Sequence, residues 1–120
     1  MDVTHEVARM KEDPAFAQNV GIVLVHHVVV RGWSKAEHRA VERLEVRVDQ
    51  ARVDALVAEL SRRPGIHKIL VETKTGELAP GDDLLFAVVA GDLRANAGPV
   101  LDELRARIKS DALTKTEHLL

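Results

Sequence analysis

Residues 21–30 have the sequence GIVLVHHVVV, the most apolar run of the chain. Most of these side chains are β-branched, which favours an extended backbone, so the run predicts a strand and not a helix. Because only two histidines interrupt the apolar residues, we expect this strand to be buried on both faces. Ten residues are too few for a membrane-spanning helix, which needs ~20 apolar residues, so we expect no membrane partner.

The segments on either side predict further strands and helices. Residues 41–48 (VERLEVRV) alternate apolar and charged side chains, which is typical of a strand with one buried face. Asp49 can then cap a helix with apolar residues at helical spacing, which Pro64 and Gly65 end. Residues 67–73 and 84–90 predict two strands that can pair as a hairpin across a turn at 76–83.

A second long helix is predicted over residues 93–109, in which Pro99 should cause a kink or a later start. A short helix at residues 3–10 and a last strand at 112–118 complete the chain. The predicted order is α-β-β-α-β-β-α-β, which does not alternate strictly. It indicates a single α+β domain over residues 1–120.

Composition excludes several classes of function. The chain has 17 Lys and Arg against 19 Asp and Glu, a net charge of −2, so no broad positive surface attracts nucleic acid or anionic lipid. Aromatic residues make up only 2%, which argues against base stacking. There is no cysteine, so the chain supplies no thiol nucleophile. With no apolar leader at its beginning, we expect a cytoplasmic protein without nucleic acid or membrane partners.

The histidines and glycines do not predict a cofactor. His26 and His27 are adjacent in the predicted strand, so their side chains should point to opposite faces and cannot easily share one ion. The other four histidines lack the spacing of metal ligands. No glycine-rich phosphate loop is present. We therefore expect neither a bound metal nor another cofactor.

Four basic residues lie where predicted elements end, namely Arg31, Arg94, Lys109 and Lys115. The ends of strands and helices are where a rigid scaffold presents side chains to a ligand. If the four converge, they can hold a phosphate-bearing anion through charge-assisted hydrogen bonds. Alternatively, each is an ordinary surface cation paired with one of the acids. On the residues alone, both interpretations stay open.

A series of short segments resembles one known family. Residues 21–32, GIVLVHHVVVRG, resemble the Gly-Ala-Val-Val-Thr-Phe-x-Gly-x-Val-Arg-Gly strand of the molybdopterin synthase catalytic (large, MoaE-type) subunit. Later family segments are matched in the same order by residues 44–46 (LEV), 75–82 (TGELAPGD), 93–94 (LR), 108–109 (IK) and 114–117 (TKTE). The resemblance spans residues 20–117.

The resemblance implies an α/β-hammerhead-like fold, a homodimer and a role in molybdenum cofactor biosynthesis. Such a subunit is a sulfurtransferase. It receives the Gly-Gly tail of a small ubiquitin-like sulfur carrier (MoaD-type), which bears a thiocarboxylate, and transfers sulfur to cyclic pyranopterin monophosphate to form molybdopterin. The resemblance makes Lys115 and Lys109 the catalytic residues, and Arg31 and Arg94 the substrate-binding residues. The partner delivers the sulfur, which fits a chain without cysteine.

The sequence also departs from the family pattern, and two other interpretations remain. Leu93 replaces the family histidine, His26 a phenylalanine and Thr114 a tryptophan, while the spacing from Lys109 to Lys115 is one residue short. These departures fit a non-catalytic MoaE-like homologue that binds the carrier or a phosphorylated pterin as a scaffold or regulatory dimer. A third interpretation is a ferredoxin-like ligand-binding domain, because residues 41–117 alone have the order β-α-β-β-α-β.

Overall fold

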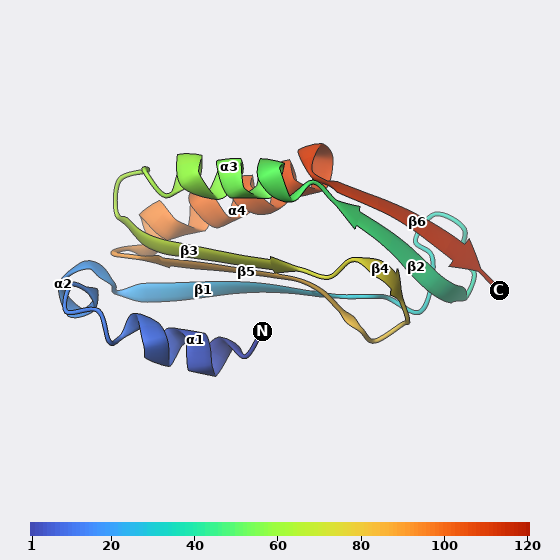
Figure 1. Cartoon of the computed structure of the whole chain (residues 1–120), viewed down its shortest axis with the longest axis horizontal. Helices are drawn as coiled ribbons and strands as arrows, with labels where there is room; N and C mark the ends of the chain where they lie inside the picture. The colour runs from blue at the N-terminus through green and yellow to red at the C-terminus, as the bar shows by residue number, and fades with distance from the viewer.

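The computed structural model describes all 120 residues and contains two three-stranded sheets in which every pairing is antiparallel (Figure 1). The strand orders are β1-β5-β3 and β4-β2-β6. The elements in chain order are α1 (Val3–Met10), α2 (Phe16–Asn19), β1 (Ile22–Val29), β2 (Val41–Val48), α3 (Gln50–Leu60), β3 (Ile66–Thr73), β4 (Gly76–Leu78), β5 (Asp83–Gly91), α4 (Arg94–Asp111) and β6 (Leu113–Leu119).

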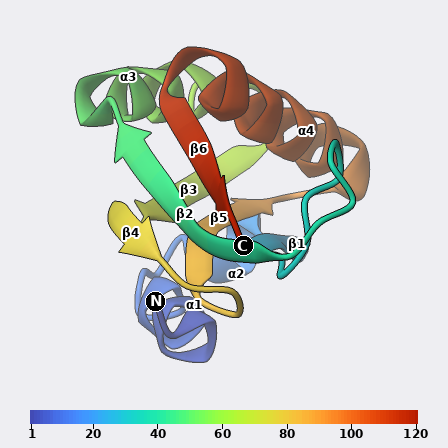
Figure 2. The same cartoon turned by 90° about the vertical axis from the view of Figure 1, so that its right-hand side faces the viewer.

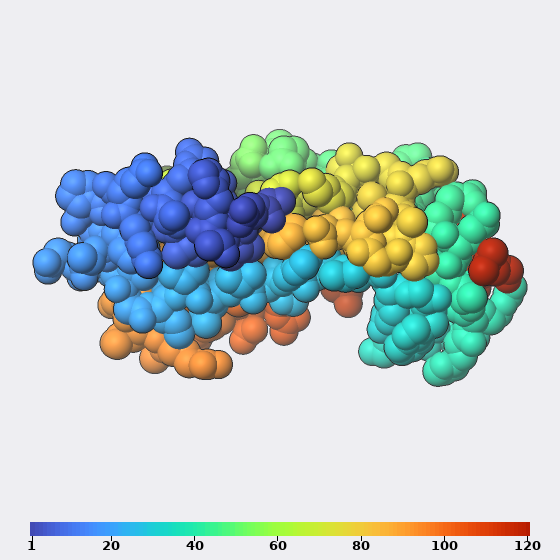
Figure 3. Space-filling view, turned by 90° about the horizontal axis from the view of Figure 1, so that it is seen from below, coloured from blue at the N-terminus to red at the C-terminus, as the bar shows by residue number.

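The main core lies between the first sheet and the helices α3 and α4. Leu60, Leu104 and Ile108 from these helices are fully buried and pack with Ala87 and Val89 of the central strand β5. Helix α1 lies across the opposite face of this sheet (Figure 3). Strand β5 is therefore covered on both faces, which agrees with its uninterrupted apolar sequence.

Strand β1 forms where it is predicted, but its expected burial on both faces is wrong. It lies at the edge of the first sheet and pairs only with β5. Val25 and Val29 are 44% and 46% exposed. An edge strand has one neighbouring strand instead of two. On the face that α1 covers, Val23 near the beginning of β1 is the residue of this strand that packs against the cluster containing Met10 of α1.

The other predicted elements are confirmed with small differences. Asp49 caps α3 by accepting a hydrogen bond from the Arg52 amide (3.1 Å), and β3 and β5 pair as the expected hairpin. Helix α4 begins at Arg94, so Pro99 lies inside it and does not delay its start. The short elements α2 and β4 were not predicted. The β4 segment was expected to be a turn, but it is extended because it pairs with β2.

The α+β class is confirmed, and the ferredoxin-like alternative is wrong. Strand β1 pairs with β5 from Ile22 to Val29, so it belongs to the core sheet and not to an appendage. The strands of residues 41–117 are also divided between two sheets. None of the helices has the length and apolarity that a membrane crossing requires.

The second sheet projects from one end of the first and crosses it at an angle (Figure 2). A small apolar cluster joins them, made of Val30, Leu44, Val46, Leu84 and Leu85. Strand β6 follows α4 almost directly and pairs with β2. The end of β1, the end of α4 and the whole of β6 consequently lie around one junction between the sheets.

Candidate functional site

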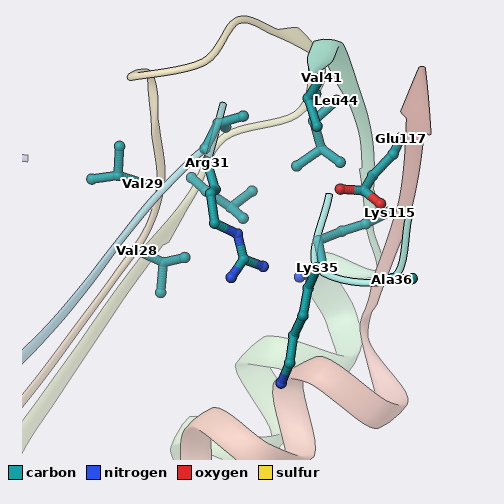
Figure 4. Close-up of a pocket in the computed structure, with 11 residues that line it drawn as sticks. Val28, Val29, Arg31, Lys35, Ala36, Val41, Leu44, Lys115 and Glu117 are labelled. Carbon is teal, nitrogen blue, oxygen red and sulfur yellow. The ribbon is translucent and has the colours of Figure 1, made fainter. Parts of the chain in front are cut away.

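A pocket of about 560 Å³ lies at the junction of the two sheets (Figure 4). Its volume falls in the range of small-ligand sites. The lining residues are Val28, Val29, Val30, Arg31, Lys35, Ala36, Val41, Leu44, Leu84, Lys115 and Glu117. Figure 3 shows the surface hollowed between the loop after β1, in teal, and the end of α4. The pocket thus has apolar walls and a few charged groups, which is typical of a ligand site.

Arg31 enters this pocket from the end of β1. The backbone before it is fixed, because the Val30 amide donates to the Asp82 carbonyl and the Val30 carbonyl accepts from the Gly81 amide, both at 2.8 Å. The guanidinium carbon lies 4.5 Å from the centre of the Trp33 ring, which is a cation–π contact. The Arg31 side chain is therefore oriented by an aromatic ring and not by an acid, and its hydrogen-bond donors are free for a ligand.

Lys115 and Glu117 enter the pocket together from β6. They pair with Val46 and Leu44 of β2, whose side chains are buried in the cluster at the junction. Side chains two residues apart on a strand share a face, and directly paired residues share it too. The register of β6 therefore turns Lys115 into the pocket in spite of the shortened connection from α4, and turns Thr114 away from it.

The environment of Lys115 lowers its pKa. Partial burial in the pocket is the largest cause, because it disfavours the charged amine. The positive charges of Lys109 and Arg31 act in the same direction, while the Glu117 carboxylate opposes them. Lys109 lies in the last turn of α4 and does not line the pocket, yet its charge reaches Lys115. Arg31 and Lys115 thus share the pocket, and Lys109 adds a positive charge that acts on Lys115 from outside it.

Arg94 does not lie at this pocket. It is the first residue of α4, and Lys109 follows it fifteen residues later. At 1.5 Å per residue this separation is about 22 Å along the helix, which an arginine side chain cannot bridge. Arg94 instead lines a second pocket, between α4 and β1, together with Leu24, Val25 and Asp102. Leu93, the residue before it, is 62% exposed.

The alternative interpretation of the four predicted cations was that each is paired with an acidic side chain on the surface. The structure shows no such pairing. Arg31, Arg94, Lys109 and Lys115 form no ion pair with any acidic side chain of the chain. The paired cations are other residues, such as Arg63 and Arg107 beside Glu103 and Lys74 beside Glu72. A group of unpaired cations around one pocket favours an anionic ligand.

Sequence reasoning missed three polar residues at the pocket: Lys35, Glu117 and, behind the wall, Ser34. Lys35 adds a further cation from the loop after β1, and like Arg31 it forms no ion pair with an acidic side chain. Glu117 could have been found, because it lies two residues after Lys115 in a predicted strand. The loop residues have no periodic pattern, so nothing in the sequence pointed to them.

The two adjacent histidines lie on opposite faces of β1, as predicted. His27 is stacked on Phe86 with 4.1 Å between ring centres, and its Nε2 lies 2.6 Å from Asp83 Oδ1. On the other face, partial burial lowers the pKa of His26, and the Arg105 charge on α4 adds to this effect. No three histidine or acidic side chains come together in a way that could hold a metal ion.

Comparison with known proteins gives the family. The sequence model described as "MoaE protein" matches residues 1–111 of the chain. The chain belongs to the MoaE family. This membership places it in molybdenum cofactor biosynthesis, as the resemblance of the short segments predicted. No curated protein matches the sequence.

Solved structures of the MoaE type have the same fold. Molybdopterin synthase from Staphylococcus aureus superimposes with a TM-score of 0.74 at 22% identity, covering 86% of this chain and 77% of that one. The molybdopterin cofactor biosynthesis protein E from Burkholderia multivorans gives 0.75 at 22% identity, with 100% and 81% covered. A complex of subunits 1 and 2 of the molybdopterin-converting factor from Helicobacter pylori gives 0.71 at 18% identity, with 99% and 80% covered.

Proposed function

We propose that this MoaE-family chain is the catalytic subunit of a molybdopterin synthase. It transfers sulfur from a thiocarboxylated carrier to cyclic pyranopterin monophosphate. The observation that carries the proposal is that Arg31 and Lys115 line one pocket, with no acidic side chain in an ion pair with either of them, while the charge of Lys109 acts on Lys115. Such a pocket suits a small molecule that carries a phosphate.

Each cation has a distinct part in this proposal. Arg31 binds the substrate phosphate or the pterin, because its planar guanidinium can make two parallel hydrogen bonds to an anion. Lys109 and Lys115 contact the terminal carboxyl group of the carrier. The lowered pKa of Lys115 enlarges its neutral fraction, so the amine can accept and return a proton during sulfur transfer. Lys109 supplies positive charge beside it.

The proposed partners follow from the family and from the position of Arg94. The Helicobacter pylori structure is a complex of two subunits, which supports a small carrier partner for this chain as well. Arg94 lies about 22 Å along α4 from Lys109, so it can act at the pocket only if it comes from a second copy. We therefore place Arg94 in the substrate site of the partner in a homodimer.

A second candidate is a MoaE-like homologue that binds the carrier or a phosphorylated pterin without turnover. It is favoured by the residues at two positions where the family has aromatic or imidazole groups. Leu93 is exposed and apolar, and Thr114 lies on the face of β6 that points away from the pocket. Neither can replace the chemistry of the family residue.

Reconstitution distinguishes the two candidates. The purified chain is mixed with thiocarboxylated carrier and cyclic pyranopterin monophosphate, and dithiolene formation is followed. We expect carrier-dependent product, and a loss of roughly 100-fold or more for Lys115→Ala, the range for a residue that moves a proton. Lys68→Ala is the matched control, because Lys68 is an exposed lysine on β3 outside the pocket. Full turnover by Lys115→Ala contradicts the assigned role, and carrier binding without product supports the non-catalytic candidate.

A further inference from the structure

Ser34 is the one buried polar side chain of the protein, with no exposed surface. Its hydroxyl donates a hydrogen bond to Glu117 Oε1 at 2.9 Å and accepts one from the Glu37 amide at 3.3 Å. The Ser34 amide and carbonyl are also bonded, to the Arg39 carbonyl and the His38 amide, each at 2.8 Å. Ser34 is thus fixed by its own loop, and its hydroxyl proton is directed at a residue 83 positions later in the chain.

The contact with Glu117 decides where a charged group of the pocket lies. Glu117 is exposed, so its carboxylate has no need of a protein partner and could remain in water. Instead it is bonded to the buried Ser34 hydroxyl behind the pocket wall, and it lies beside Lys115 on the same face of β6. A charge-assisted hydrogen bond of this kind is stronger than a neutral one and fixes the geometry of both groups.

We propose that Ser34 is a positioning residue, which holds the Glu117 carboxylate on the pocket wall beside Lys115 and so controls the charge that the pocket presents. The inference rests on the proposed function for its biological meaning, but the contact itself does not depend on it. Four charged groups face or influence the Lys115 amine from the surrounding elements: Arg31 after β1, Lys35 in the loop, Lys109 on α4 and Glu117 on β6. Glu117 is the single negative one.

The consequence for Lys115 has a definite sign. A carboxylate nearby favours the charged amine, so Glu117 offsets part of the lowering caused by burial, Lys109 and Arg31. Without the Ser34 hydroxyl, Glu117 is released towards solvent and its charge is screened by water. Ser34→Ala should therefore lower the pKa of Lys115 further, although residue 34 does not line the pocket.

The test is an NMR pH titration of the Lys115 amine in the intact chain, which needs neither carrier nor pterin. We expect Ser34→Ala to shift the titration midpoint downwards, in the same direction as Glu117→Gln and by no more. In the double variant, Ser34→Ala should add nothing to the shift of Glu117→Gln, because both act through one carboxylate. Ser61→Ala is the control, since it removes a hydroxyl that bonds a backbone carbonyl of α3, and it should leave the midpoint unchanged.

Several outcomes overturn the proposal. It is wrong if Ser34→Ala leaves the Lys115 midpoint unchanged while Glu117→Gln lowers it, or if the two shifts add in the double variant. Ser34→Thr keeps the hydroxyl, and covers the case in which Ser34→Ala disturbs the loop. It should retain the wild-type midpoint, and a midpoint as low as that of Glu117→Gln would contradict the assigned role. Because these readouts do not involve synthase activity, they stand even if the proposed function fails.

Discussion

Two inactive variants should restore each other's activity if Arg94 acts across a homodimer. The variants are Arg94→Ala and Lys115→Ala. Arg94 begins α4, whereas Lys115 lies near the beginning of β6, which follows the far end of that helix. Within one chain, Arg94 is about 22 Å along the helix from Lys109, and Lys115 comes six residues after Lys109 in the sequence, beyond the end of the helix. A complete site then takes Lys115 from one chain and Arg94 from the other.

The size of the rescue follows from counting sites. Random pairing of equal amounts makes about half of the dimers mixed, as expected for a two-fold assembly. In a mixed dimer, the site with the intact Lys115 also receives the intact Arg94, whereas the other site lacks both. About one quarter of all sites are therefore complete, and we expect about one quarter of the wild-type rate.

The assay compares dithiolene formation by the mixed variants with that of each variant alone. Chains are mixed in mild denaturant and returned to buffer so that subunits exchange. The matched control pairs Lys115→Ala with Arg31→Ala, two residues that line the same pocket. Every site of that mixed dimer lacks one of them, so no rescue is expected. Absence of rescue with Arg94→Ala, or rescue in the control, would refute the reasoning.

Three further predictions test the pocket and the core. Lys35→Ala should weaken binding of inorganic pyrophosphate about two- to fivefold in calorimetry, the effect of one exposed charge, while Lys68→Ala should not. The pKa of Lys115 is lower in the folded than in the unfolded chain, so the unfolded chain binds more protons at this site. The free energy of unfolding should therefore rise with pH between the lowered pKa of the folded chain and the ordinary pKa near 10.5. Urea titrations should show that this rise is smaller in Lys115→Met. Leu104→Ala should cost about 2–5 kcal/mol in the same urea experiment, because Leu104 is fully buried in the main core, and a smaller loss would contradict that packing.

Local patterns predicted most elements of the fold but not their arrangement. The helical spacing after Asp49 defined α3, and the alternation in residues 41–48 defined β2, because both patterns arise from neighbours in the chain. The position of β1 at an edge could not be predicted. Residues 21–30 are as apolar as β5, and which of the two occupies the centre depends on pairing with β3, far away in sequence.

The candidate site shows the same limit. The family resemblance singled out Arg31 and Lys115, which the structure brings to one pocket, and Lys109, whose charge acts on Lys115. The predicted helix over residues 93–109 already placed Arg94 and Lys109 at its opposite ends, so the sequence could have shown that these two cations do not converge within one chain. The contact of Ser34 could not be predicted from the sequence, because its partner Glu117 is 83 residues away and the loop around Ser34 has no periodic pattern.

The apolar cluster between the two sheets also shapes the pocket. Three of its members, Val30, Leu44 and Leu84, also line the pocket, so the same side chains that fasten one sheet to the other set the spacing of the charged groups. Exchanging one of these aliphatic residues for a smaller or larger one would tilt the sheets and alter the width of the binding cleft. Under the proposed function, the choice of ligand can thus change through aliphatic residues that carry neither a charge nor a hydrogen-bonding group.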